Sequence, residues 1–176
     1  MWVRRLACLI LLPLLLTGCA PRHALAPKPS AGEPSASAQP RLVSDRCIRV
    51  IDGDTIHTRR NGPIRLIGVD APEHDEDFFT EAQQFVAQRV DGKEVRLEIC
   101  PITPKDRYGR YRAIVFFRDG DQWVNLNRLL VAQGMAVISD YRPCHISAEE
   151  EWREDEQHAR QSALGVWAKS RGESRR

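Results

Sequence analysis

The sequence has almost no excess of charge of either sign. Its 176 residues include 26 Lys and Arg and 24 Asp and Glu, which gives a formal net charge of +2 at pH 7. Proteins that coat nucleic acid through a broad basic field have a much larger positive excess. That class is therefore excluded, and any polyanion has to be bound at a concentrated site. The hydrophobic fraction of 42% also excludes disorder throughout the chain.

Long hydrophobic runs are absent as well, since crossing a bilayer takes about 20 helical residues. The longest run, residues 6–16, follows two arginines and contains a proline, which is typical of an export signal. It leads into Leu16-Thr17-Gly18-Cys19, which resembles the lipobox of bacterial lipoproteins. We therefore expect residues 1–18 to be a lipoprotein signal peptide and Cys19 to be acylated. An ordinary secreted protein or an uncleaved anchor is the alternative.

The residue after the lipobox bears on localisation. Residue 20 is Ala rather than the Asp associated with retention in the inner membrane. The resemblance therefore implies a lipid anchor in the bacterial cell envelope, at the outer membrane. A secreted or inner-membrane-anchored protein is the alternative.

Large apolar residues are scarce from Ala20 to Val43, where Pro, Ala and Ser dominate. Such a segment cannot bury enough surface to offset the entropy lost on ordering, so we expect residues 19–43 to form the acylated Cys and a semi-extended tether. Folding should begin near Ser44 and give one domain over residues 44–168. A polar basic tail follows over residues 169–176.

The cysteines lack the spacing of a metal site. In an exported chain, Cys47, Cys100 and Cys144 remain in an oxidising compartment besides Cys19. None lies in a Cys-x-x-Cys pair or near a His at zinc-ligand spacing. Three thiols leave two possibilities: one disulfide with a free thiol, or no disulfide.

Alternating apolar residues and turn signals predict several short strands and two or three helices, and no internal repeat is visible. Such a set indicates an α+β domain built on a small barrel. Thr80 with Gln83, and Ser147 with Glu150, resemble capping boxes that begin helices. The other expected elements are strands over Arg46–Ile51, Thr55–Thr58, Ile64–Val69, Val95–Ile99, Ala113–Phe117 and Gln122–Val124, and a helix over Asn125–Gln133.

Carboxylates gather in one short stretch of the chain. Asp54 lies in a tight turn, and Asp70 and Glu73 follow a strand that contains Arg65. Two carboxylates from separate strand ends can bind a hard divalent cation and leave positions for water and a phosphate oxygen. A third carboxylate beside the ion can accept a proton from the bound water.

A second stretch, Lys105–Arg110, is a basic turn with an aromatic residue inside it. Two guanidiniums can hold phosphate oxygens and neutralise the charge that develops during attack. Taken alone, each part is more often a turn, a solvated loop or a surface pair. Together in one short domain, they indicate metal-assisted phosphodiester hydrolysis.

These stretches carry a family resemblance. Val50–Thr55, Arg65–Glu73 and Asp106–Arg110 resemble, in order and spacing, the signature blocks of the thermonuclease (staphylococcal nuclease-like) family, and Leu164–Trp167 resembles the end of its last helix. The resemblance covers about residues 45–168. It implies an OB-fold, a five-stranded Greek-key β-barrel with three α-helices. It also implies Ca²⁺-dependent hydrolysis of DNA and RNA to 3′-phosphate products.

The resemblance assigns the metal ligands and the base. It implies that Asp54, Asp70 and the main-chain carbonyl of Ala71 bind Ca²⁺, with Asp52 supporting the ligands from behind. Glu73 is then the general base that acts on a water.

The resemblance also assigns the residues that hold the substrate. Arg65 and Arg110 clamp the phosphate and stabilise the transition state. Arg107 and Tyr108 contact a neighbouring phosphate. Tyr141 falls where an aromatic stacks on a base, although the barrel core could claim it equally well.

Two features depart from the family pattern. The loop His74-Asp75-Glu76-Asp77 is short and acidic where the best-known member has a longer Lys-rich loop. Its acids could repel phosphate or bind a second cation, and His74 is either a solvated loop residue or a metal ligand. Ser139 stands where a second stacking aromatic is expected, which suggests a thinner base platform.

The family fold also bears on the cysteines, because the regions of Cys100 and Cys144 approach each other in its barrel. It implies a Cys100–Cys144 disulfide with Cys47 free.

Two functions from different classes follow. The first is a monomeric, lipid-anchored nuclease that acts on DNA or RNA. The second is a non-catalytic OB-fold lipoprotein that binds nucleic acid or has a structural role in the envelope. The presence of Arg65, Glu73, Arg110 and both Asp ligands favours the first.

Overall fold

The computed structural model describes residues 41–168. The expected signal peptide, the lipid anchor at Cys19, residues 20–40 of the tether and the tail from residue 169 lie outside the described residues. Within the described range, no helix has both the length and the apolar character that a membrane span requires.

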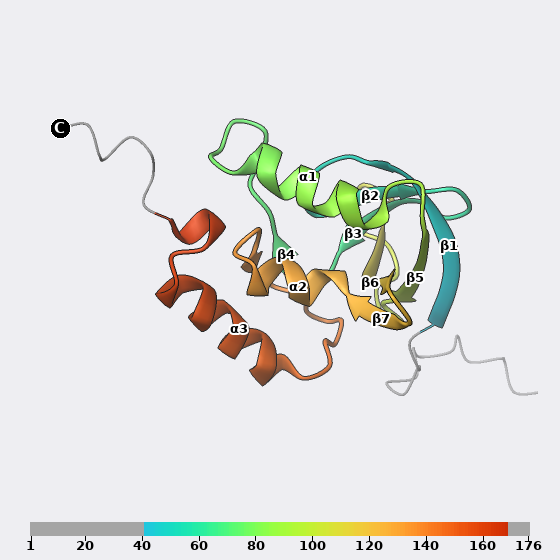
Figure 1. Cartoon of the computed structure of the whole chain (residues 1–176). Helices are drawn as coiled ribbons and strands as arrows, with labels where there is room; N and C mark the ends of the chain where they lie inside the picture. The colour runs from blue at the N-terminus through green and yellow to red at the C-terminus, as the bar shows by residue number, and fades with distance from the viewer. Residues whose placement is uncertain (1–40, 169–176) are drawn as a thin grey trace, which may run out of the picture. The chain divides into compact units, whose positions relative to one another are not determined.

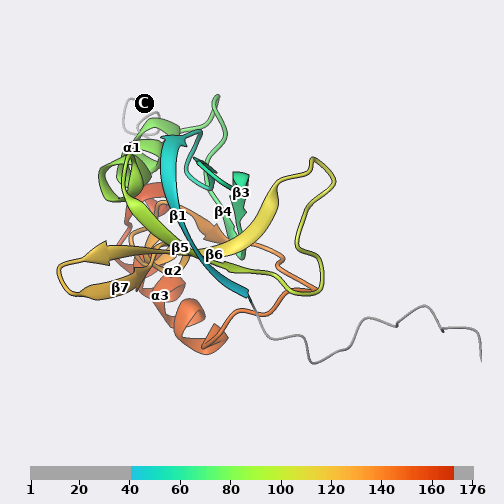
Figure 2. The ribbon, with the colours of Figure 1, turned by 90° about the vertical axis from the view of Figure 1, so that its right-hand side faces the viewer.

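Five strands close into a barrel. They lie in the order β3 (Gly62–Leu66), β2 (Thr55–Thr58), β1 (Arg41–Val50), β5 (Glu94–Ile99) and β6 (Tyr111–Asp119), and parallel pairing of β3 with β6 closes the ring. β7 (Gln122–Asn125) extends the sheet as a hairpin with β6. β4 (Val69–Asp70) pairs with β8 (Val137–Ile138) in a separate sheet. The closed barrel, seen from two sides in Figures 1 and 2, confirms the predicted OB-fold.

Alternation along the strands fills the barrel. In β5, Val95, Leu97 and Ile99 are buried, while the residues between them are half-exposed. Such a period-2 pattern places one face of the strand in the core. The Asn61-Gly62 pair turns β2 into β3 as predicted, with Gly62 at a φ of 72°, a conformation that glycine adopts without strain.

Residues 41–168 contain three α-helices, as the resemblance implied, and two of them pack on the barrel (Figure 1). α1 (Phe79–Val90) packs on β1 and buries Ala82, Val86 and Val90. α2 (Leu126–Ala132) packs against both β6 and α3 (Glu149–Gln161), whose Trp152 is fully buried. The 3₁₀ turn η1 (Gly165–Trp167) follows α3.

Both predicted capping boxes are wrong. The residue before α1 is Phe78 and the residue before α3 is Ala148; each has a positive φ, and neither end has a side-chain cap. Thr80 is already inside α1, so its hydroxyl cannot serve the first turn. Gln83 instead donates a hydrogen bond to the carbonyl of Ile51 at 2.6 Å, which fixes α1 to the end of β1.

Several strand boundaries also differ from the prediction. β1 begins at Arg41 rather than at Arg46, and folding begins before Ser44, because residues 41–45 already pair with β5. The expected strand over Ile64–Val69 is divided into β3 and β4, since Gly68 between them has a φ of 77°. This break turns the chain out of the barrel toward β8.

Cys100 and Cys144 form a disulfide, the pairing that the resemblance implied, across a sequence separation of 44. Cys47 is a free, buried thiol. Burial raises the pKa of this thiol to about 11, so it stays protonated at neutral pH.

Asp45 is a buried carboxylate inside the barrel wall. It accepts hydrogen bonds from the backbone N–H groups of Arg46, Arg60 and Asn61 and from the Asn61 side chain. Burial alone would raise its pKa, but hydrogen bonds from the Arg46 N–H, the Asn61 and Thr58 side chains and the Arg60 N–H lower it below its ordinary value. In its charged form, the Asp45 carboxylate therefore fixes the turn between β2 and β3.

We predict that Asp45→Asn destabilises the domain by about 1.5–3 kcal/mol at neutral pH, the usual worth of hydrogen bonds to a charged group. Because the folded-state pKa is lowered, the stabilisation is present above the unfolded pKa and is lost as pH falls through the folded value. Urea unfolding followed by Trp fluorescence should show a smaller difference between variant and wild type near pH 3. Asp121→Asn, at an exposed turn, is the control; an equal loss at both pH values would contradict the role of the charge.

Candidate active site

The turn between β1 and β2 places Asp54 against the next layer of the fold. The backbone N–H of Asp54 donates to Asp52 Oδ1 at 2.9 Å, which closes the Asp52-Gly53-Asp54 turn. A Cβ on Gly53 would lie 2.5 Å from the Cβ of Ala71 and 2.9 Å from that of Ala82. Glycine therefore allows the turn to pack directly on the segment after β4 and on α1.

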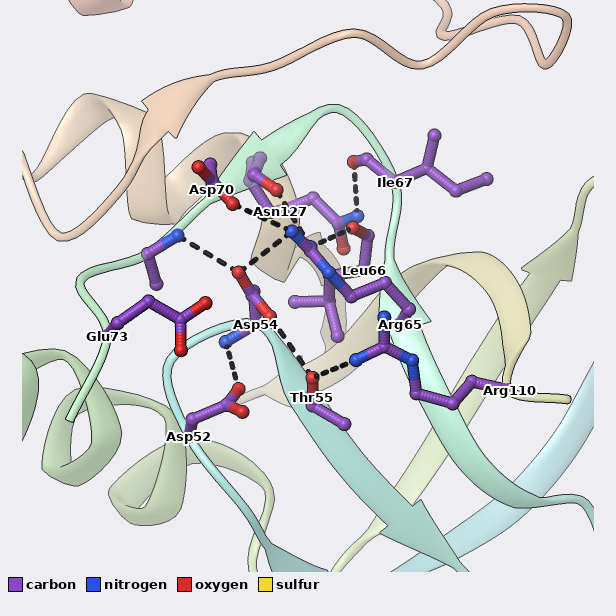
Figure 3. A network of polar contacts seen from close by, with 12 residues as sticks. Asp52, Asp54, Thr55, Arg65, Leu66, Ile67, Asp70, Glu73, Arg110 and Asn127 are labelled. Carbon is purple, nitrogen blue, oxygen red and sulfur yellow. Dashed lines mark hydrogen bonds and ion pairs between the residues drawn. The ribbon is translucent and has the colours of Figure 1, made fainter. Parts of the chain in front are cut away.

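Arg65 lies between two carboxylates (Figure 3). Its Nη2 is 3.0 Å from Asp54 Oδ2 and 2.9 Å from Asp70 Oδ1. Its Nη1 donates to the main-chain carbonyls of Leu66 and Val69, both at 2.8 Å. The guanidinium thus holds the turn before β2, the end of β3 and β4 together around one positive charge.

Asp54 is the more buried of the two carboxylates. Burial raises its pKa to about 6, and the neighbouring Asp52 adds to the rise, against the lowering effects of Arg65 and of hydrogen bonds from the Ala71 N–H and the Thr55 hydroxyl. Its charged form therefore depends on nearby positive charge.

Arg110 reaches the same site from the segment before β6. Its Nε is 2.7 Å from Asp106 Oδ2, and its Nη1 donates weakly to Thr55 Oγ1 at 3.4 Å. Burial would raise the Asp106 pKa, but hydrogen bonds from Arg110 and from the Tyr108 N–H lower it. Asp106 therefore stays charged and fixes the direction of the Arg110 side chain.

A groove of about 390 Å³ runs from this site along the loop that joins β5 to β6, which projects from the barrel in Figure 2. Arg107 and Tyr108 lie on that exposed loop, where the Arg107 Nη2 donates to the Tyr108 hydroxyl at 2.6 Å. The residues that line the groove are Arg65, Leu66, Ile67, Gly68, Asp106, Arg107, Tyr108, Arg110, Arg112, Ser139 and Asp140.

Tyr141 lies beside this groove rather than in its lining. The side chain packs partly against the core, and a hydrogen bond with Glu149 raises its pKa. Its main-chain carbonyl accepts from Arg112 Nη2 at 3.2 Å. Base stacking by Tyr141 stays a prediction, and the structure places Ser139 and Arg112 on the groove wall at this point.

Glu73 is exposed, and its carboxylate points toward Asp54 in Figure 3. Its backbone N–H donates to Glu76 Oε2 at 2.8 Å, and its carbonyl accepts from the Glu76 N–H at 2.9 Å. One acid of the short loop therefore orders the backbone that carries Glu73. His74 contacts the ring of Phe79, with ring centroids 5.2 Å apart.

Asn127 is a buried residue that sequence reasoning missed. Its Oδ1 accepts from the Val115 N–H at 2.9 Å, and its Nδ2 donates to the carbonyls of Ile67 and Ala113 at 2.8 and 3.2 Å. It thereby joins α2 to β6 and to the Gly68 turn behind Arg65. Only its position on the inner face of the predicted helix could have signalled this, because a polar residue there needs buried partners.

The donor chemistry suits a hard cation. No group of three or more His, Cys, Asp or Glu side chains within residues 41–168 is arranged to hold a metal ion. Asp54 and Asp70, however, direct oxygens at the same guanidinium nitrogen, so two carboxylates converge at one point. Ca²⁺ and similar ions take carboxylate, carbonyl and water oxygens. The pair fits such an ion if water and phosphate complete the shell.

The backbone of Ala71 also contacts the Asp54 carboxylate. Its N–H donates to Asp54 Oδ2 at 3.0 Å. Metal binding by its carbonyl stays a prediction.

Comparison with known proteins identifies the family of the chain. The family described as Staphylococcal nuclease homologue matches residues 63–169. A micrococcal nuclease of Shigella flexneri is 34% identical over 129 residues, which cover 69% of this chain and 71% of that protein. A thermonuclease of Staphylococcus hyicus is 33% identical over 151 residues, which cover 81% and 83%. Endonuclease YncB of Bacillus subtilis is 30% identical over 149 residues, which cover 80% and 69%.

The fold and the site define an OB-fold protein whose paired carboxylates and arginines meet at one end of the β2–β3 hairpin. The family match spans more than half of the chain and includes Arg65, Asp70, Glu73 and Arg110. The chain belongs to the staphylococcal nuclease family, as the sequence motifs predicted.

We predict that Gly53→Ala displaces Asp54, because the new Cβ overlaps the Cβ of Ala71. Overpacking of this kind costs about 1–3 kcal/mol, and hydrolysis of plasmid DNA should fall with it. Adding Ala71→Gly to the variant removes the worse overlap and should restore part of both losses. Thermal unfolding and plasmid assays measure the two effects, and no recovery in the double variant would show that packing at Gly53 is not the cause.

Proposed function

We propose that this protein is a Ca²⁺-dependent endonuclease that hydrolyses DNA and RNA to 3′-phosphate products at the bacterial envelope. Membership of the staphylococcal nuclease family supports hydrolysis of phosphodiester bonds. The observation that carries the proposal is the convergence of Asp54, Asp70 and Arg65 at the end of the groove that Arg110 lines.

Asp54 and Asp70 would hold the cation, with the Ala71 carbonyl as a third protein ligand. When bound, Ca²⁺ supplies a positive charge that attracts a phosphate oxygen and polarises a water. Asp52 supports this arrangement through its hydrogen bond with the Asp54 N–H.

Arg65 and Arg110 hold the phosphate in this proposal. Guanidinium forks match phosphate oxygens and keep their charge at any physiological pH. Both side chains are already fixed, Arg65 by two carbonyls and Arg110 by Asp106. Donors that are oriented before the reaction stabilise developing charge without reorganising during it.

Glu73 accepts the proton of the attacking water. The water oxygen forms a new bond to phosphorus, and the P–O5′ bond breaks. The O5′ oxygen leaves with the electron pair of that bond and takes a proton from solvent, so the phosphate stays on the 3′ oxygen of the other nucleotide. Glu73 can act on solvent because it is exposed and its backbone is held by Glu76.

We predict that the purified protein nicks plasmid DNA, and cleaves single-stranded DNA and RNA, with Ca²⁺ and stops in EDTA. Arg110→Ala should slow cleavage by about 10³–10⁵, the range for arginines that stabilise phosphoryl transfer. Glu73→Gln should lose several orders of magnitude, because an amide cannot accept the proton.

Exposed residues of α3 provide matched controls: Glu154→Gln for the base and Arg153→Ala for the arginine. Both should keep wild-type rates. Full activity in Glu73→Gln or Arg110→Ala would refute the assigned roles. An inactive wild-type protein that still binds single strands would support the non-catalytic OB-fold alternative.

Acylation at Cys19 is tested separately. We predict that the protein expressed in a Gram-negative host enters the detergent phase on Triton X-114 partitioning, because each buried CH₂ contributes about 0.8 kcal/mol to membrane binding. Cys19→Ser should move it to the aqueous phase, and Cys8→Ser should not. Equal partitioning of the wild type and Cys19→Ser would contradict the anchor.

A further inference from the structure

Four arginines lie around the end of the β2–β3 hairpin that is farther from the active site. Arg59 and Arg60 are in the turn after β2, and both are exposed. The Arg59 N–H donates to the carbonyl of Arg46 on β1, and Arg49 on β1 pairs with His57 on β2. We call Arg46, Arg49, Arg59 and Arg60 the hairpin arginine patch.

The arginines of this patch have no ion-pair partner among the described residues. Among the ion pairs formed by residues 41–168, none includes any of its four arginines. Arg46 donates from Nη1 to the carbonyl of Gly92 at 2.6 Å, which fixes its direction.

Three of these arginines line a concavity of about 210 Å³ together with Ser44, Asp45 and Glu94. Asp45 is buried and already accepts from the backbone N–H groups of Arg60 and Asn61. Glu94 is the remaining acid of the lining, and it pairs in register with Arg46. Three guanidiniums against two carboxylates, of which only Glu94 is exposed, leave the concavity with an excess of one positive charge.

The patch and the active site share one hairpin. Thr55 pairs with Arg65 at the site end, and Thr58 pairs with Gly62 at the other end. Thr55 and Thr58 are the first and last residues of β2, and three steps of ~3.3 Å separate the two ends by about 10 Å.

One face of the hairpin, the face turned away from the core, runs from the active site to the hairpin arginine patch. Ile56 and Ile64 are fully buried, so the neighbouring pair, His57 with Pro63, lies on the opposite face, as Arg65 does. Arg49 extends this face onto β1.

We propose that the hairpin arginine patch binds phosphates of the substrate strand a few nucleotides from the scissile bond, an inference that rests on the proposed nuclease function. A nucleic acid strand carries regularly spaced phosphates, and guanidiniums without carboxylate partners can pair with them. The chain as a whole has almost no net charge, so affinity for a long strand has to come from local groups such as these.

The test compares Arg59→Ala/Arg60→Ala with a control of equal charge change, Arg153→Ala/Arg160→Ala on α3. All variants are made in the chain from residue 19 with Cys19→Ser. Fluorescence anisotropy in EDTA measures binding to a labelled single strand of about 20 nucleotides, longer than the ~4–16 that one OB-fold covers. A substrate with a single phosphodiester, thymidine 5′-(4-nitrophenyl phosphate), measures the active site alone in Ca²⁺.

We expect the patch variant to bind the long strand ~10-fold more weakly, with a salt dependence shallower by about 1.4 in log K against log [salt], from two lost phosphate contacts. Its rate on the single phosphodiester should equal that of the wild type. The control variant should match the wild type in both assays.

Unchanged binding of the long strand, or no binding by the wild type, would overturn the inference even if plasmid cleavage is normal. Binding to vesicles of phosphatidylcholine and phosphatidylglycerol that falls only in the patch variant, with unchanged strand binding, would assign the patch to a membrane surface and also overturn it. Absence of plasmid cleavage with normal strand binding would instead refute the proposed nuclease function.

Discussion

The Asp54 carboxylate is almost buried, and a buried charge is unfavourable unless a partner and hydrogen bonds compensate for its lost hydration. Arg65 is that partner because the β2–β3 register sets Thr55 opposite Arg65. The same guanidinium binds Asp70, so β4 depends on it too. Losing Arg65 would leave two carboxylates facing each other around an unfilled position. A metal ion and Arg65 would therefore bind the same two carboxylates. The ion would take them as ligands, and Arg65 holds them in position.

Most of the site could be predicted from sequence, because its residues follow strands and turns with strong local signals. Asp-Gly-Asp and Asn-Gly are short turns whose conformation depends on the glycine, and alternation located the barrel strands. Asp54, Arg65, Asp70 and Arg110 accordingly meet where the motifs indicated. The disulfide came only from the family resemblance, since spacing alone left two possibilities.

Other features depend on tertiary contacts that leave no local signal. α1 and α3 begin after Phe78 and Ala148 in left-handed conformation, whereas the sequence offered polar residues that looked like caps. Gln83 was such a residue, yet its side chain binds the end of β1. Asn127 is one polar residue in a helix, and its three partners come from distant segments. Rules based on local sequence propensity cannot predict hydrogen-bond partners that lie far away in the sequence.

The length of the β2–β3 hairpin sets the distance between the active site and the turn at the other end of the hairpin. Its ends are tied to the active site by Arg65 and to the barrel wall by Asp45, so the strand residues between them fix one spacing. Side chains alternate faces along a strand, so inserting one residue into each strand would turn the outer residues into the core. Inserting two residues into each strand would keep every side chain on its present face and lengthen the hairpin by about 6.6 Å. Regular strands can therefore change this spacing only by two residues at a time in each strand.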